Sequence, residues 1–274
     1  MTQTATRPVS VSELQRAWRA VREGEFRCDS PRPRRGVANP DPECRWSPPG
    51  PVITILGCHP QAGVSTLAVA MATVAAPAQV IECASATATG LACAATAELG
   101  TTDGWRIGRR GQVHLARSST ALLTPAEVPV PPAFEDPQRL LVLDVGWELG
   151  QLLAGQSWVN RTVAEAASAV VTTTATTPGL RRLENALTML SPLEPAIAVR
   201  GPARRRWPRH LEAGLGPLST HASRAGRLQC IPTDKDLAER GLTGQDLPAP
   251  LLQAAAHLLA LTAPKLNLME GTTR

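Results

Sequence analysis

The sequence predicts an α/β fold with a doubly wound, mostly parallel sheet over residues 51–264. Short apolar segments alternate with helical patterns along this range, as parallel strands joined by crossover helices require. One apolar segment, residues 52–56, runs into a tight loop and then a helical run, and another ends in Asp144. At 274 residues the chain is long enough to bury a sizeable core.

The first 50 residues are predicted to form a separate piece. A capping box opens a short amphipathic helix that places Leu14, Trp18 and Val21 on one face. Residues 28–50 contain six prolines among many charges and are expected to form an extended linker. The helix either packs back on the main domain, docks on a partner protein through these three side chains, or lies on a membrane surface.

The elements of the main domain are predicted from apolar runs and helical periodicity. Strands are expected at residues 52–56, 79–83, 112–116, 140–143, 169–173, 196–199 and 228–231. Helices are expected at residues 66–76, 88–98, 149–154, 179–190 and 251–261. The helix after Gly179 would align Leu180, Leu183 and Leu187, and the last helix would begin behind Pro250. Residues 105–113 are hairpin-like, and residues 265–274 are expected to form a C-terminal tail.

Residues 52–66 look like a phosphate-binding loop without its lysine. Strand, tight loop and helix start follow one another, a setting in which backbone N–H groups hold a phosphate. Against the pattern GxxxxGK[ST], Cys58 replaces the first glycine and Val64 replaces the lysine, whereas Gly63 and Ser65 are kept. Ser65 therefore retains the hydroxyl that would hold Mg²⁺, but the positive charge is missing.

Asp144 is the second candidate for chemistry. It follows the apolar run 140–143, which is typical of a buried strand, and ligands of open α/β sheets bind beyond the carboxyl ends of the strands. An aspartate at that position can hold Mg²⁺ beside a loop serine such as Ser65. Alternatively, Asp144 caps the turn that follows its strand.

In the order of these segments the chain resembles the ParA/MinD-like P-loop ATPases. The loop of that family reads xKGGxGK[ST]T and aligns without a gap. His59 then falls on the signature lysine, Val64 on the Walker lysine, and Ser65 and Thr66 on the hydroxyl pair. Asp144 matches the Walker B aspartate.

Two later segments extend the resemblance to roughly residues 51–262. Residues 170–178, VVTTTATTP, are similar to the family's later strand and its VTTPE turn, and residues 231–234, IPTD, are similar to its IPxD segment near the adenine. The resemblance implies a Mg²⁺ site at Ser65 and Asp144. It implies nucleotide contacts at Gly57, His59, Gly63, Val64, Ser65, Thr66, Pro232 and Asp234.

Departures from the family pattern predict that the chain is not an efficient ATPase. Both family lysines are absent from the loop, and the sequence has lysines only at positions 235 and 265. Glu82 fits the first position of the family's acidic pair, whereas Ala84 removes the second, which helps to place the attacking water. Phosphoryl transfer needs positive charge and an oriented water, so binding of ATP and Mg²⁺ is expected to be weak or absent. The loop without lysine also resembles the loops of uncharacterised ParA-like proteins of actinobacterial mobile elements.

A run of arginines follows the strand predicted at residues 196–199. Such a cluster would bind the phosphates of DNA, contact another anion or a nucleotide, or form a solvated loop that meets a partner. The run contains Arg204, Arg205, Arg206 and Arg209.

Composition narrows the class of protein further. The formal net charge is +5, and the six cysteines form no CxxC pair, so reduced thiols in a cytoplasmic protein are expected, with disulfides or zinc as the alternative. No charged segment followed by an apolar core opens the chain, and no 18-residue window is uniformly apolar. A secretory signal and a transmembrane segment are therefore not expected.

These observations predict a degenerate ParA/MinD-like pseudo-ATPase that acts as a binding or regulatory component. The resemblance implies a partition or conjugation context on a mobile element and allows a homodimer. One alternative is a working ATPase in which an arginine, from residues 204–206 or from a second subunit, replaces the lysine. Another is a DNA-binding adaptor that uses the fold as a scaffold.

Overall fold

The computed structural model describes residues 10, 12, 46–132, 136 and 139–270, with side chains as far as residue 262. The chain divides into two units, Met1–Asp41 and Pro42–Arg274. Leu14, Trp18 and Val21 lie outside the described residues, so the docking helix stays a prediction. The predicted limits of the domain and of the tail also stay predictions.

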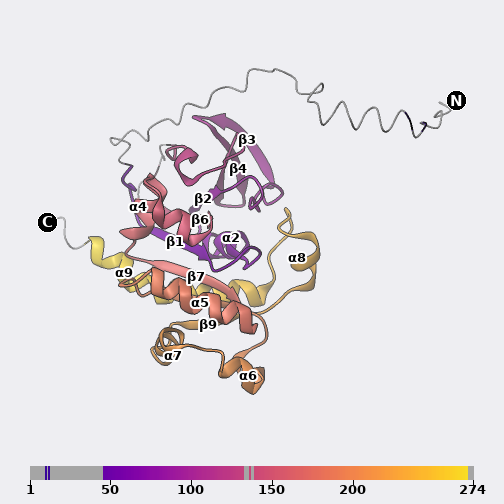
Figure 1. The fold of residues 1–274 in the computed structure, drawn as a ribbon. Coiled ribbons are helices and arrows are strands. Elements are labelled where there is room, and N and C mark those ends of the chain that lie inside the picture. Colours follow the sequence, from indigo (N-terminus) through magenta and orange to yellow (C-terminus); the bar gives the residue numbers. More distant parts are fainter. Residues whose placement is uncertain (1–9, 11, 13–45, 133–135, 137–138, 271–274) are drawn as a thin grey trace. The chain divides into compact units, whose positions relative to one another are not determined.

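Within the described ranges, nine strands form one sheet (Figure 1). Their order is β3-β4-β5-β2-β6-β1-β7-β8-β9. The seven strands from β5 to β9 in this order are parallel, and β4 is antiparallel to both of its neighbours. The strands are β1 (Val52–Gly57), β2 (Ala78–Ala84), β3 (Ala97–Thr102), β4 (Trp105–Arg110), β5 (Val113–Ser118), β6 (Leu140–Gly146), β7 (Ala169–Thr174), β8 (Ala196–Arg200) and β9 (Leu228–Ile231).

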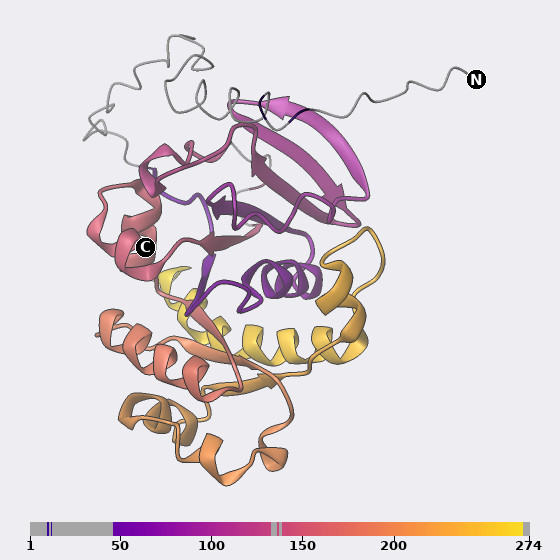
Figure 2. The same cartoon turned by 45° about the vertical axis from the view of Figure 1, so that its right-hand side comes forward.

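Helices cover both faces of the sheet (Figure 2). Alternate strand residues feed two apolar cores, so that on β6 Val142 packs in the core that contains α2, and Leu143 packs in the opposite one. This double burial explains why the strands are uniformly apolar in sequence. One face carries α2 (Val64–Val74), α8 (Lys235–Arg240) and α9 (Ala249–Glu270). The other carries α3 (Leu149–Ala154), α4 (Trp158–Ala164), α5 (Thr177–Met189), α6 (Arg209–Glu212) and α7 (Pro217–Arg224).

The observed elements confirm the predicted fold class, extend the hairpin-like segment and correct two of the predicted helices. Residues 88–98 are not a helix: they form turns up to residue 96, and Ala97 begins β3, which pairs with β4. The hairpin-like residues 105–113 belong to the antiparallel pair of β4 and β5, which continues to Ser118. The last helix runs to Glu270, beyond its predicted end at residue 261.

No helix in the described part of the chain is both long enough and apolar enough to cross a membrane.

Candidate functional site

The loop after β1 ends in an open helix N-terminus. The Cys58 N–H donates to the Thr172 carbonyl at 2.9 Å, which extends the pairing of β1 with β7 into the loop. Gly63 then takes a left-handed conformation, with φ 100°, and serves as N-cap of α2 without a side-chain capping bond. The first N–H groups of a helix have no partner within the helix, so an end without a capping side chain suits an anion.

The position of the missing lysine is filled by an apolar contact. A Cβ placed on Gly57 would lie 2.8 Å from Val64 Cγ2, so the Val64 side chain covers the end of β1 and leaves no room for a side chain at position 57. Val64 is half-buried. The loop therefore presents the methyl groups of Val64 at the position where the pattern GxxxxGK[ST] has a lysine.

Asp144 lies beside this helix start, next to the Ser65 hydroxyl. The sheet register places Asp144 next to Ile55 of β1 and Glu82 of β2, and its side chain points to the face that α2 covers. Asp144 is 1% exposed, and among the described residues neither carboxylate oxygen has a hydrogen-bond partner. Burial and the neighbouring Glu82 raise the pKa of Asp144 to about 7, although the nearby Ser65 hydroxyl lowers it in part.

A turn at residues 89–91 covers Ser65. The Glu82 carboxylate holds this turn: it accepts bonds from the Thr89 hydroxyl at 2.8 and 2.9 Å, from the Gly90 N–H at 2.8 Å and from the Leu91 N–H at 3.0 Å. A Cβ on Gly90 would lie 2.6 Å from Ser65 Oγ, so the turn packs directly against the serine. The predicted helix at residues 88–98 fails here because Glu82 binds the backbone N–H groups in a different arrangement.

Ser65 and Asp144 together fit a magnesium ion. A hydroxyl and an unpartnered buried carboxylate are the hard oxygen donors that Mg²⁺ prefers, and Mg²⁺ takes its remaining ligands from water or phosphate. Across the described residues, no group of three or more His, Cys, Asp or Glu side chains could hold a metal by itself. A magnesium ion at this place would therefore depend on a ligand that brings further oxygens.

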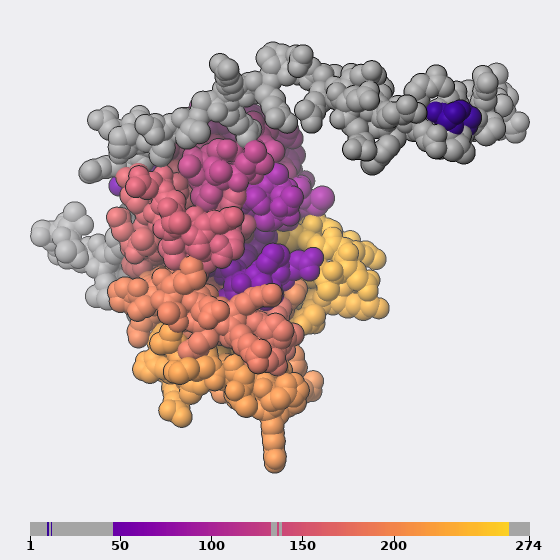
Figure 3. Space-filling view, viewed as in Figure 1, coloured from indigo at the N-terminus to yellow at the C-terminus, as the bar shows by residue number. Residues whose placement is uncertain are grey.

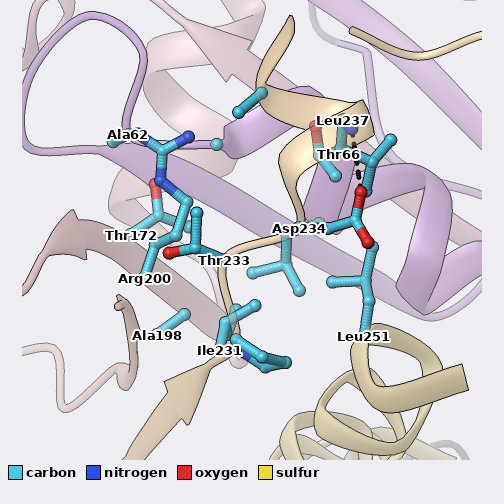
Figure 4. Close-up of a pocket in the computed structure, with 14 residues that line it drawn as sticks. Ala62, Thr66, Thr172, Ala198, Arg200, Ile231, Thr233, Asp234, Leu237 and Leu251 are labelled. Atoms are coloured by element: carbon cyan, nitrogen blue, oxygen red, sulfur yellow. Dashed lines mark hydrogen bonds between the residues drawn. The ribbon is translucent and has the colours of Figure 1, made fainter. Parts of the chain in front are cut away.

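A pocket opens on the other side of the α2 N-terminus (Figure 4). Gly63 and Thr66 form its loop side, and Arg200 at the end of β8 forms one flank. Asp234 stands at the opposite flank, where its Oδ1 accepts a bond from the Leu237 N–H at 2.9 Å and caps α8. The floor is apolar and is formed by Ala198, Ile231 and Leu251, and Leu67 and Leu237 add further apolar side chains to the lining.

The predicted site residues are thus divided among several places. Four of them, Gly63, Thr66, Pro232 and Asp234, line the pocket. His59 does not: its Nε2 lies 3.2 Å from Thr174 Oγ1, at the end of β7. Ser65 and Asp144 lie together under the turn, and Gly57 and Val64 pack on each other.

Sequence reasoning missed Arg200. It is the last residue of β8, directly after the apolar run 196–199, at the edge of the sheet where ligands of α/β folds bind. The sequence signal for Arg200 is a basic residue at the carboxyl end of a predicted strand.

All four arginines of the run are exposed, and one of them is anchored by side-chain contacts. Arg204 binds Glu212 through Nε at 3.0 Å and through Nη2 at 2.9 Å, donates to Ser223 Oγ, and lies 6.0 Å from the centre of the Trp207 ring. Arg205, Arg206 and Arg209 are exposed. Figure 3 shows the orange part of the chain, to which this segment belongs, on the surface of the molecule. Arg204 is therefore engaged within the fold, and the other three are accessible.

No family model matches the sequence, and no curated protein matches it. Among solved structures, the chain is similar to a putative plasmid partition protein from Borrelia burgdorferi B31 bound to AMPPNP, at 11% identity and a TM-score of 0.48 over 79% of this chain and 99% of that one. It is also similar to apo McdA from Cyanthece, at 11% identity and a TM-score of 0.48 over 78% of this chain and 99% of that one. At this identity and TM-score, the similarity does not establish a function. The fold is assigned from the chain's own strand order and register.

Proposed function

We propose that the chain is a degenerate ParA/MinD-like nucleotide-binding protein, which binds a nucleotide without efficient hydrolysis and acts as a binding or regulatory component. The observation that carries the proposal is the unpartnered, buried Asp144 beside Ser65 at the uncapped start of α2. A buried carboxylate without a partner is costly, and a bound cation would relieve that cost. The pocket beside the same helix start supplies further groups for contact with such a ligand, among them Gly63, Thr66 and Arg200.

The expectation of slow hydrolysis rests on the groups that are absent from the described site. Lys235 is directed elsewhere, since its Nζ lies 3.8 Å from Glu239 on α8. Glu82 is occupied by the turn at residues 89–91, and Ala84 carries no group that could orient a water. Loss of one electrostatic donor typically slows such reactions by about 10²–10³, and several are missing here.

Titration calorimetry with ATP and Mg²⁺, combined with a phosphate-release assay, tests this proposal. We expect measurable binding of Mg²⁺–ATP and phosphate release at the background rate. Asp144→Ala should weaken the binding of Mg²⁺–ATP more than that of ATP with a chelator. Absence of nucleotide binding would reject the proposal, and robust turnover abolished by Asp144→Ala would support a working ATPase instead.

A DNA-binding adaptor is the second candidate, favoured by the exposure of Arg205, Arg206 and Arg209. If these side chains neutralise phosphates, affinity for arbitrary duplex DNA falls steeply with salt, with a slope of about −0.9 per phosphate contact. Replacing all three with alanine should flatten that slope. Arg227→Ala is the control, since Arg227 pairs with Glu194 at 3.3 Å elsewhere on the sheet edge. Salt-independent binding, or none at low ionic strength, would remove this candidate.

A further inference from the structure

We propose that Arg200 supplies the positive charge that the loop lacks, so that the pocket holds the phosphate groups of a nucleotide between Arg200 and the start of α2. The proposal rests on the proposed nucleotide binding and names the residue that makes it work. It differs from the sequence-based alternative, in which an arginine from the run at residues 204–206 takes this role.

The sheet fixes the direction of the Arg200 side chain. Arg200 pairs with Thr174 of β7, and the Gly201 N–H that follows donates to the Ile231 carbonyl at 2.9 Å. Ala198, two residues earlier on the same strand face, packs in the core that contains α2. The Arg200 side chain therefore rises on the face where the loop and α2 lie.

Contacts place the side chain against the loop. Arg200 Cδ lies 3.8 Å from the Cβ position built on Gly63, the N-cap of α2. Figure 4 shows the guanidinium group extending from β8 toward Ala62, with Thr172 beside it. The guanidinium and the open end of α2 thus border the same side of the pocket.

The charges at this side are not balanced by the protein. Arg200 has no ion pair or side-chain hydrogen bond within the described ranges, in contrast to Arg204, which binds Glu212. A helix N-terminus carries a partial positive charge, so two positive groups face one space. The arrangement favours an anion between them, and a guanidinium with adjacent N–H groups is well suited to phosphate oxygens.

The remaining lining indicates a nucleotide rather than a simple phosphate. The apolar floor formed by Ala198, Ile231 and Leu251 would bury a flat base or ribose, and Asp234 at the opposite flank would repel a second anion. The pocket is thus cationic on one side, apolar below and acidic on the other side. An extended ligand with one anionic end fits this order.

Affinities of adenosine, AMP, ADP and ATP, measured by calorimetry with Mg²⁺ for the full chain and for Arg200→Gln, test the proposal. We expect Arg200→Gln to weaken ATP binding about tenfold to a hundredfold, as loss of a hydrogen bond to a charged group typically does, and to leave adenosine binding unchanged. Arg200→Lys should retain part of the difference in affinity between ATP and adenosine, because lysine keeps the positive charge. Arg205→Gln is the matched control and should bind ATP like the unmodified chain, because Arg205 is exposed and does not line the pocket.

Each other outcome is decisive. If the unmodified chain binds none of the four compounds, the proposed function and this inference both fail. If it binds ATP and Arg200→Gln binds ATP equally well, only the role of Arg200 fails. An equal loss of adenosine and ATP binding in Arg200→Gln would overturn the inference, because loss of a contact with phosphate leaves adenosine binding unchanged.

Discussion

At the scale of single residues, Asp144 is the most unusual group in the described chain. A carboxyl group with a pKa of about 7 in the folded protein and 3.8 as its ordinary value binds its proton more tightly when folded. Its contribution to stability is therefore present below about pH 4 and is lost as the pH rises toward 7. Burial is the main cause, because removal from solvent disfavours the charged carboxylate form.

We expect the free energy of unfolding to fall by about 2 kcal/mol between pH 5 and pH 7 because of Asp144 alone. Asp144→Asn should remove this fall, since an amide does not titrate. Urea denaturation at both pH values in the presence of a chelator measures the effect. Asp103→Asn is the control, because Asp103 is exposed and its left-handed backbone, with φ 47°, suits asparagine. An unchanged pH dependence in Asp144→Asn would contradict the assignment.

Val64 permits a gain-of-function prediction at the same scale. Val64→Lys places an ammonium group at the start of α2, where it can reach a phosphate held by the loop. We expect the affinity for Mg²⁺–ATP to rise by about tenfold or more, the usual effect of a charged hydrogen bond. Val64→Met is the matched control, since it adds length without charge. Equal affinity in the two variants would show that the loop no longer holds a phosphate.

At the scale of elements, the sequence predicted what local pattern determines and missed what distant contacts determine. The strands were predictable because both of their faces are buried, as Val142 and Leu143 illustrate. Residues 88–98 were not, because their alanine-rich composition favours a helix. The Glu82 carboxylate on β2 competes for the N–H groups of Gly90 and Leu91, and this choice depends on tertiary structure.

The turn at residues 89–91 gives a prediction about stability. Gly90→Ala should destabilise the fold by about 1–3 kcal/mol, since the new Cβ meets Ser65 Oγ at 2.6 Å and Ser65 Cβ at 2.8 Å. Ser65→Gly removes both atoms, so a double-mutant cycle should show that Gly90→Ala costs much less in that background. Denaturant unfolding of the four proteins measures the coupling. Additive effects would mean that the turn does not rest on Ser65.

At the scale of the whole molecule, the site depends on strand order that the sequence does not state. Asp144 was predictable as a residue at the end of a buried strand, but its position between β1 and β2 follows from the order β2-β6-β1. Arg200 reaches the loop because β8 lies two strands from β1. Asp144 and Arg200 are isolated charged residues in the sequence, and only the strand order of the sheet brings them to the same edge.

The last prediction concerns where the folded unit begins. Trp46 packs edge-on against Trp158 of α4, with ring centres 4.8 Å apart, and the division between units falls earlier, after Asp41. Deleting residues 1–41 should therefore leave the melting temperature nearly unchanged. Deleting residues 1–48 removes Trp46 as well and should lower it by about 1–6 °C, because such aromatic pairs contribute about 0.5–1.5 kcal/mol beyond their buried area.

Differential scanning calorimetry of the two truncated proteins measures this difference, and Trp46→Ala in the full chain is the matched variant. It should reproduce the loss seen on deleting residues 1–48, because the aromatic contact with Trp158 is what that deletion removes and the shorter one keeps. If deleting residues 1–41 already lowers the melting temperature by as much, the first unit stabilises the second. The predicted helix with Trp18 would then pack on the main domain instead of docking on a partner.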